Sequence, residues 1–134
     1  MAKESGIVAI VAVDDSGSSA RTISNDITDF SFSTPRNMID ITGLDKLAME
    51  RAQGLADFSV TFNGVFDDGS NLAHAVFSTV SSSSVIRTVT ITISGQILPN
   101  EVFFSDYSIS RSAAAELTWT APGVLTGGVV PTWA

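Results

Sequence analysis

The sequence contains no cysteine and only one histidine, His74. The absence of thiols excludes disulfide scaffolds, thiolate metal sites and cysteine nucleophiles, and a lone imidazole excludes zinc motifs that need two histidines. No G-x-S-x-G or S-x-x-K pattern marks a serine as a nucleophile, and no glycine-rich phosphate loop occurs. We therefore expect no enzymatic activity, no cofactor and no bound metal.

Charge is also scarce. Charged residues make up 16% of the 134 positions and the net charge is −7, whereas an average soluble domain is about 25% charged. The basic residues are scattered, so the chain shows no basic footprint for nucleic acid. Solubility alone explains the acidity, but so few charges also indicate that partners cover part of the surface. Neither lysine lies in a predicted strand, so the sheet edges lack a common protection against pairing with other chains.

Long apolar runs are missing as well, and none approaches the ~20 residues that cross a bilayer. The stretch "IVAIVAV" at 7–13 runs directly into Asp14 and Asp15 without a small-residue cleavage site. We therefore expect neither a signal peptide nor a membrane partner, and we expect synthesis in the cytoplasm.

Alternation of apolar and polar side chains dominates the remaining sequence and predicts β-strands. The expected strands are 7–13, 22–32, the alternating part of 56–69, 85–97, 102–110 and 115–121. "LPNE" and "RSAA" are expected to separate the last three. The phase of 22–32 slips near Thr28 and Asp29, which predicts a β-bulge, and Gly64 predicts a kink or a close backbone approach.

One helix is predicted within "DDGSNLAHAVFSTV", residues 67–80, with Ser70 or Asn71 as its N-cap. Its apolar side chains recur at helical spacing: Leu72, Ala73, Val76, Phe77 and Val80. The "DDGSN" stretch lacks the spacing of a calcium loop and predicts a turn. The whole chain, 1–134, therefore predicts a single mainly β domain: an antiparallel β-sandwich or barrel with one short flanking α-helix.

The aromatic residues allow one binding function. Trp119, Trp133 and Tyr107 would form a sugar platform if they lay together on an exposed face. Trp119 has the same parity as Leu117, however, and this favours a place in the core. His74 lies between two alanines of the predicted helix and is expected to be structural.

Residues 36–55 separate two strongly patterned strands, although the median connection is about 4–6 residues. Part of this segment, 43–55, has near-helical spacing and predicts either a helical turn or an ordered loop. Its large apolar side chains would be exposed in a monomer and buried by a contact between subunits, unless the segment folds back as a lid on the core. The candidate interface residues are Ile39, Ile41, Leu44, Leu47 and Met49, with Lys46, Glu50 and Arg51 as charge pairs at the rim.

This segment also carries a family resemblance. From "IDITGLDKLAMERAQGLADFSVTFNGVFDDG" through the helix and the later strands, about residues 22–121, the chain resembles the tail tube (major tail) proteins of long-tailed bacteriophages. The matching points are Asp40 to Gly43, Glu50-Arg51, Gly54, Asp57 and "FNGVFDD". The resemblance implies a β-sandwich with a flanking helix. Its subunits would close into rings, typically hexameric, and the rings would stack into a hollow tube through which DNA is ejected.

The resemblance also assigns parts and partners. It implies an N-terminal strand or arm (1–20), an inter-ring loop (36–55) and a C-terminal tail (122–134) that bridge rings, with sheets of adjacent subunits joined in an inner barrel. The partners would be the protein itself and the tape measure, tail terminator and baseplate or distal tail proteins. Duplex DNA would pass without specific binding. The product would be made in the bacterial host cytoplasm and end in the virion tail. A tube protein of a secretion or pyocin-type system and a monomeric β-sandwich binding module are the alternatives.

The stretch "RTVTITISG", residues 87–95, poses a further question, because its polar face is uncharged. The wall of a DNA-conducting tube should be hydrated but should not bind DNA, since even non-specific protein–DNA binding reaches a Kd of about 10⁻⁴–10⁻⁶ M. Hydroxyl rows meet that need, although the high β-propensity of threonine explains them equally well. The candidate lumen residues are Thr88, Thr90, Thr92, Ser94, Thr118 and Thr120.

Overall fold

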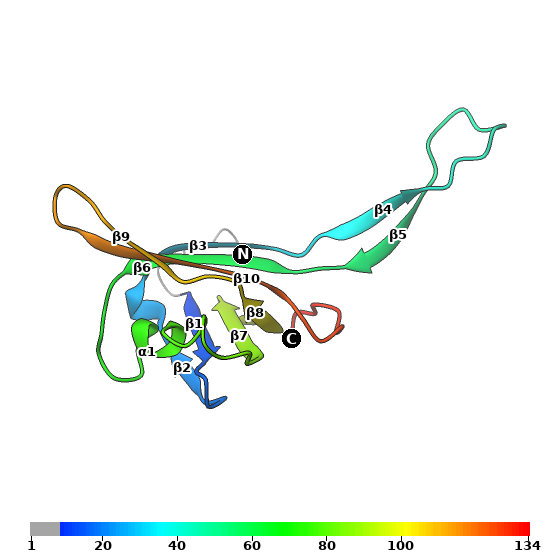
Figure 1. The fold of residues 1–134 in the computed structure, drawn as a ribbon. Coiled ribbons are helices and arrows are strands. Elements are labelled where there is room, and N and C mark those ends of the chain that lie inside the picture. Colours follow the sequence, from blue (N-terminus) through cyan, green and yellow to red (C-terminus); the bar gives the residue numbers. More distant parts are fainter. Residues whose placement is uncertain (1–8) are drawn as a thin grey trace.

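The computed structural model describes residues 9–134, and its fold is almost entirely antiparallel β (Figure 1). Eight strands form one sheet in the order β2-β1-β7-β8-β10-β6-β3, with β9 also paired to β10. Their bounds are β1 (Ile10–Asp14), β2 (Ala20–Thr22), β3 (Ile27–Ser33), β6 (Ser59–Val65), β7 (Arg87–Ile93), β8 (Gln96–Phe104), β9 (Ser108–Arg111) and β10 (Leu117–Leu125). A separate two-stranded ribbon joins β4 (Arg36–Asp40) to β5 (Arg51–Ala56).

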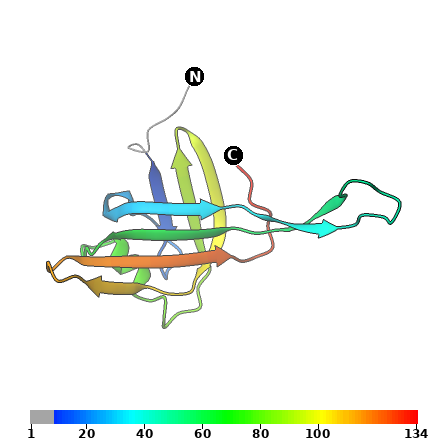
Figure 2. The same cartoon turned by 90° about the horizontal axis from the view of Figure 1, so that it is seen from above.

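The large sheet folds over into two layers (Figures 1 and 2). Strands β3, β6, β10 and β9 make one layer, and β1, β2, β7 and β8 make the other. Within residues 9–134, β3 and β2 terminate the strand order without pairing to each other. The sheet therefore stays open, and the architecture is a sandwich rather than a closed barrel.

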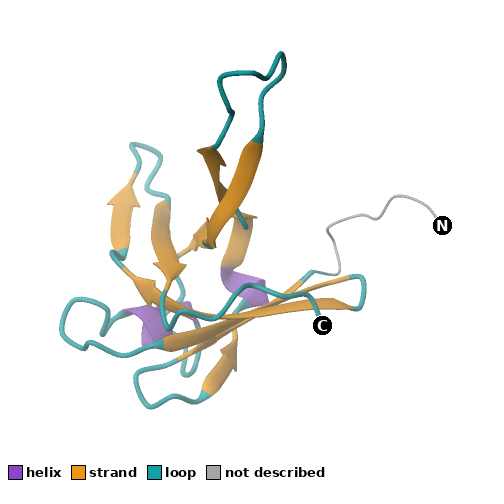
Figure 3. Cartoon of the chain, turned by 90° about the vertical axis from the view of Figure 1, so that its right-hand side faces the viewer, coloured by secondary structure: helices purple, strands orange, loops and turns teal. Residues whose placement is uncertain are grey.

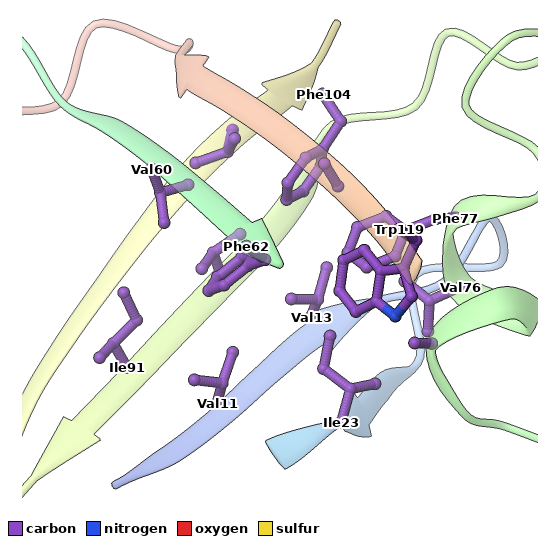
Figure 4. Close-up of a cluster of buried hydrophobic side chains, with 14 of the residues drawn as sticks. Val11, Val13, Ile23, Val60, Phe62, Val76, Phe77, Ile91, Phe104 and Trp119 are labelled. Atoms are coloured by element: carbon purple, nitrogen blue, oxygen red, sulfur yellow. The ribbon is translucent and has the colours of Figure 1, made fainter. Parts of the chain in front are cut away.

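The core lies between the two layers, where Trp119, Phe62 and Phe77 pack against valines and isoleucines of the opposite layer (Figure 4). Phe62 is 0% exposed and Trp119 is 1% exposed. Gly64 is required beside this cluster, because a Cβ there would overlap the carbonyl oxygen of Asp26 and the indole of Trp119. This confirms the close backbone approach expected at that glycine.

The alternation predicted most strand faces correctly. In β7, Val89 and Ile91 are buried while the threonines between them are half-buried. The predicted bulge is also confirmed, since the pairing of β3 with β6 shifts register between Ile27 and Asp29. Of the predicted strand 7–13, the structure shows β1 from Ile10, and residues 1–8 lie outside the described part of the chain.

The boundaries after residue 85 were partly wrong. The predicted strand 85–97 is a hairpin, in which β7 and β8 are joined by Ser94 and Gly95 with φ angles of 50° and 81°. Two positive φ angles fit the tight hairpin turns whose twist matches the strands. "LPNE" was expected to interrupt the strands, yet it lies inside β8, where Pro99 is opposite Thr90.

The helix is shorter than predicted and its cap is different. Helix α1 covers Ala73–Phe77, with Leu72 as its N-cap residue and no side-chain cap from Ser70 or Asn71. Asn71 instead has a φ of 62° in the preceding turn. The backbone N–H of Ala73 donates to Oδ2 of the buried Asp26, 3.0 Å away, so a distant carboxylate orients the start of the helix. That residue belongs to the 3-10 helix η2 (Ser24–Asp26).

The segment 122–134 was expected to be a tail, but its first part is strand, because β10 continues to Leu125. The rest is docked. The N–H of Thr126 donates to Glu101 O at 2.9 Å, and that of Ala134 donates to Ile97 O at 2.8 Å. Trp133 packs against Phe32 with ring centroids 6.0 Å apart.

A buried arginine ties the helix to the sheet. Arg87 is 1% exposed. Its Nη1 donates to the carbonyl oxygens of Val76 (2.7 Å) and Asp14 (3.0 Å), and its Nη2 donates to Oγ1 of Thr79 (3.0 Å). No helix among residues 9–134 is long and apolar enough to cross a membrane.

Candidate assembly surfaces

A hairpin projects from one end of the sandwich, and we call residues 36–56 the arm (Figures 1 and 3). It consists of β4, β5 and a tip loop at 41–50, and it leaves the body between β3 and β6. The pairs Met38–Gln53, Ile39–Ala52 and Asp40–Arg51 set its register. The predicted inter-ring loop is therefore a β-hairpin, and the helical turn considered for 43–55 does not form.

The tip loop is ordered by its own polar groups. Oγ1 of Thr42 donates to Asp40 Oδ1 (2.7 Å) and accepts the N–H of Glu50 (2.8 Å). The hydrogen bonds from Thr42 hold the pKa of the Asp40 carboxyl below its usual range. Lys46 Nζ lies 3.8 Å from Glu50 Oε1, an exposed pair of the kind that contributes about 0–1 kcal/mol.

The predicted interface residues of the arm are all exposed. Leu44 and Leu47 are fully exposed, and Ile39, Ile41 and Met49 are about half exposed. The arm is therefore not a lid on the core. A two-stranded hairpin alone is marginally stable in water, so this geometry fits an arm that packs against another molecule.

A second surface is the outward face of the layer β3-β6-β10-β9, which we call the hydroxyl face. Residues directly opposite in antiparallel pairs share a face, and the register places small polar side chains together across four strands. They are Asp29, Ser31, Ser33, Ser59, Thr61, Asn63, Ser108, Ser110, Thr118 and Thr120.

Hydrogen bonds connect the hydroxyl face across its strands. Thr120 Oγ1 donates to Asn63 Oδ1 (2.8 Å), and Asn63 Nδ2 donates to Asp29 Oδ1 (2.7 Å). Ser33 and Ser59 are 3.1 Å apart between their Oγ atoms. Asp29 is the only charged residue at these positions, and Val65, Pro122 and Val124 lie on the same face. The face is therefore mostly polar, close to neutral and free of Lys and Arg.

The structure separates the predicted lumen residues into two groups. Thr118 and Thr120 belong to the hydroxyl face. Thr88, Thr90 and Thr92 lie on β7, in the other layer, and alternate with the buried Val89 and Ile91, so they face away from the core. There Thr88 Oγ1 donates to Glu101 Oε1 at 2.6 Å. Ser94 lies in the β7–β8 turn and belongs to neither face.

The edges of the same layer are free. Within the described chain, β3 pairs only with β6, and β9 pairs only with β10. All pairs in this layer are antiparallel and it has four strands, so strand direction alternates from one edge to the other. If a second copy in the same orientation is placed beside the first, the β3 strand of the second copy runs antiparallel to the β9 strand of the first. Open edges of this kind are templates for pairing with another chain.

Among residues 9–134, no cluster of three or more His, Cys, Asp or Glu side chains could hold a metal ion. His74 Nδ1 lies 3.1 Å from the Tyr107 hydroxyl and its ring packs on Phe66, which agrees with a structural role. Burial raises the pKa of Tyr107. The sugar platform does not form, because Trp119 is in the core and Trp133 packs on Phe32.

Most of the hydroxyl face was missed by sequence reasoning. The signal was present in the alternation of Ser31 and Ser33 with Phe30 and Phe32. That alternation predicted which side chains point outward, but no local pattern indicated which strands lie next to each other. The role of Asp26 could not be recognised from the sequence, because its carboxylate accepts the N–H of Ala73, 47 positions further along the chain.

The geometry defines a class: an open antiparallel sandwich with free sheet edges and a projecting hairpin, which is suited to self-assembly. No protein-family model matches the sequence, and no curated protein matches it. Solved structures do match. A chain in the virion of a native gene transfer agent particle has a TM-score of 0.78 at 16% identity, covering 97% of this chain and 99% of that one.

Two further structures carry the same fold. A chain in the tail of an empty gene transfer agent particle, refined with C6 symmetry, has a TM-score of 0.79 at 16% identity, covering 98% of both chains. The SPP1 tail tube has a TM-score of 0.68 at 6% identity, covering 89% of this chain and 73% of that one. The resemblance to tail tube proteins is thus confirmed at the level of the fold.

Proposed function

We propose that this protein is the tube subunit of a phage-type tail, a structural virion protein that polymerises into stacked rings. The observation that carries the proposal is the fold shared over almost the whole chain with a tail solved under C6 symmetry. Six subunits per ring follow from that likeness. The tape measure, terminator and distal tail proteins would then be partners inside the tube and at its ends.

The free edges support ring closure. Joining β9 of one copy to β3 of the next extends the antiparallel pattern, and the hydroxyl face continues without a break around the ring. The contact joins two different edges, β9 of one copy and β3 of the next, so it is head-to-tail. Such a contact generates a ring when the rotation between copies closes. Such closure also removes the exposed edges.

The hydroxyl face supports a lumen that duplex DNA can pass. Hydroxyl and amide groups hold water, and a wall without Lys or Arg offers no counterion-releasing contacts to phosphates. Asp29 adds weak repulsion that fades beyond about 8 Å at physiological salt. We therefore assign the lumen to the hydroxyl face, on the side of the sandwich opposite to the β7 threonines.

The arm supports stacking, because it extends beyond its own body and carries exposed Ile, Leu and Met. The sharpest test shortens it without touching the body, by replacing residues 41–50 with Asn-Gly. The pair Asp40–Arg51 is then closed by a two-residue turn. We expect a folded β-rich protein that can still form rings but makes no tubes. Circular dichroism and negative-stain microscopy of concentrated protein, with the unmodified chain as control, give the answer.

Either of two outcomes would contradict this proposal. An unmodified chain that stays monomeric at high concentration, even with tail-initiating partners, would favour a monomeric binding module. Normal tubes from the shortened variant would show that stacking does not depend on the arm tip.

The lumen assignment has a matched pair of variants. Ser110→Lys places a cation on the hydroxyl face, and Thr90→Lys places one on the outward face of β7. Assembled tubes of Ser110→Lys should retain duplex DNA at physiological salt and release it at high salt. Tubes of Thr90→Lys should retain as little duplex DNA as tubes of the unmodified protein. Equal retention by both would overturn the assignment.

A further inference from the structure

The two layers of the sandwich are staggered at the β3 edge. Figure 2 shows that β1 and the β7–β8 hairpin run across the strands of the other layer and extend past β3. Within residues 9–134, β3 pairs only with β6, so no further strand covers this extension. The core-facing side chains of β3 are therefore covered incompletely. Phe30 and Phe32 are half-buried, whereas Phe62 on the neighbouring strand is 0% exposed.

A cavity of about 320 Å³ lies beneath this edge. Ile27 and Phe30 line it from β3, and Ala9 and Val11 line it from the start of β1. The remaining lining residues are polar: Ser24, Thr28 and Asp29. The cavity shows that the space between the two layers is not filled along β3.

A second cavity, about 300 Å³, lies at the β7–β8 turn and includes Ile93 and Trp133 in its lining. The ring of Trp133 packs against that of Phe32, with their centroids 6.0 Å apart. This cavity therefore continues the incompletely covered apolar surface beyond the end of β3. We call its apolar residues together with those of β3 the β3 seam: Ile27, Phe30, Phe32, Ile93 and Trp133.

The opposite edge of the same layer carries an apolar side chain that its own body leaves exposed. In β9, Ile109 is paired with Trp119 and so shares the face that points to the core. Trp119 is 1% exposed, but Ile109 is 43% exposed. Arg111 is the next residue on this face, and it ends the strand in an exposed position. Ile109 is thus the apolar group that β9 offers on the core side.

The parity of the side chains fixes where Ile109 falls when β9 of one copy pairs with β3 of the next. A shift of one residue would turn every side chain to the other face. A continuous hydroxyl face therefore requires Ser110 to share a face with Ser31. Ile109 then shares the face of Phe30 and Phe32, and this holds for every register that keeps the hydroxyl face continuous.

We propose that the β3 seam is an incomplete part of the core that Ile109 of the neighbouring copy in the same ring completes, an inference that rests on the proposed tube function. The extension of β1 and the β7–β8 hairpin past β3 is the surface on which the incoming β9 lies. The occupant is a second copy, because the β9 edge of this chain continues the strand direction, the hydroxyl face and the apolar face of β3 together.

The C-terminal tail takes part in this contact, because Trp133 lines the seam. The N–H of Ala134 donates to Ile97 O at 2.8 Å and so holds the end of the tail on β8. The tail therefore serves contacts within a ring, in addition to any role between rings.

A matched pair of alanine variants tests the seam. Ile109→Ala shortens the side chain that enters the neighbour, and Ile97→Ala makes the same change at a residue of β8 that is 39% exposed and faces away from the core. We expect Ile109→Ala to raise the critical concentration for tube formation about tenfold or more, and Ile97→Ala to change it less than about twofold. Sedimentation of a concentration series measures both.

Disulfide trapping tests the geometry, because the natural chain contains no cysteine. Ile109→Cys is combined in turn with Ile27→Cys, Phe30→Cys and Phe32→Cys. Within one copy, β6 and β10 separate β3 from β9. The Cα atoms are then about 14 Å apart, whereas a disulfide needs about 7 Å or less. Any bond therefore joins two copies. The control series uses Ser110→Cys with the same three partners and places the two thiols on opposite faces.

We expect oxidised tubes of at least one Ile109→Cys variant to give a ladder of covalent oligomers on a non-reducing gel, and the Ser110→Cys series to give none. A ladder from the Ser110→Cys series alone would reverse the parity and overturn the seam. Equal critical concentrations for Ile109→Ala and Ile97→Ala would also overturn it, and this comparison decides if a cysteine pair prevents assembly. Circular dichroism on every variant confirms that it is folded. Absence of tubes from the unmodified protein would instead defeat the proposed function itself.

Discussion

The arm and the body are built from the same kind of alternating strand, yet their apolar side chains have opposite fates. In the body, Phe62 and Val60 of β6 are buried between two layers. In the arm, Ile39 and Ile41 alternate just as regularly and stay exposed, because no second layer lies against them. Alternation therefore specifies which face is apolar but not what covers it.

This difference shows how one sequence can encode both a fold and an assembly. Burying a Leu- or Ile-sized side chain contributes roughly 1.5–3 kcal/mol. In the body this free energy stabilises the monomer, whereas in the arm it becomes available only when another subunit is present. The predictions below compare these two uses, ranked by their effect on the free energy of unfolding of the monomer.

The largest effect should come from the body. Phe62→Ala opens a cavity between the layers, where Phe62 contacts the rings of Phe30 and Phe104. We expect a loss of about 3–5 kcal/mol in the free energy of unfolding. Urea denaturation of the monomer measures it. A loss below about 1 kcal/mol would mean that the two layers are not closely packed.

Arg87 should come next. Replacing it with Met leaves the carbonyl oxygens of Val76 and Asp14 without their donor, and each buried unsatisfied group costs about 1–3 kcal/mol. Burial lowers the pKa of this arginine. Arg87→Lys keeps a charge but cannot hold three acceptors with a planar fork, so we expect an intermediate loss. A Lys variant as stable as the unmodified protein would contradict the bridging role.

Asp26 should give a smaller, pH-dependent effect. Burial, and then the neighbouring Asp67, raise its pKa above the ordinary value of 3.8, although the hydrogen bond from Ala73 opposes the shift. Its contribution to stability is therefore complete below about pH 3.8 and is lost as pH rises through the raised pKa. Asp26→Asn keeps an oxygen for the Ala73 N–H and removes this titration. Urea midpoints measured between about pH 4 and pH 7 should fall more for the unmodified protein than for the variant.

The arm tip should have the smallest effect on folding. Leu44→Ala combined with Leu47→Ala removes two exposed side chains, and we expect the free energy of unfolding to change by no more than about 0.5 kcal/mol. The critical concentration for tube formation should nevertheless rise. Sedimentation of the two proteins at matched concentration checks this. Loss of monomer stability would show that the tip packs on its own body.

The strands and the core faces were largely predictable from the sequence, because side-chain parity is a local property. The turn at Ser94-Gly95 was also readable in principle, since this pair begins a new phase of alternation. Pro99 was misleading. A proline is expected at the end of a strand, but here it occupies a position on β8 that still fits the pleat.

The candidate surfaces were only partly predictable. The apolar side chains of the arm were expected to be exposed in a monomer, and they are; their part in contacts between subunits stays a prediction. Its hairpin form was not foreseen, since Gly54 within β5 and Gly43 in the tip suggested the ends of a helix. The hydroxyl face required strand order, which depends on contacts between distant segments. Thr118 and Thr120 were therefore named as lumen candidates, whereas Ser31, Ser59 and Ser110, which share their face, were not.

In a tube stacked head-to-tail as proposed, the position of the arm at one end of the body would give the filament a direction. Every arm would point the same way, so one end of the filament would present arms and the other the opposite end of the body. Growth would then be templated from a single end, and two finished filaments could not be joined by identical ends. A capping protein would need only to imitate one partner of the contact, either the arm or the surface that receives it.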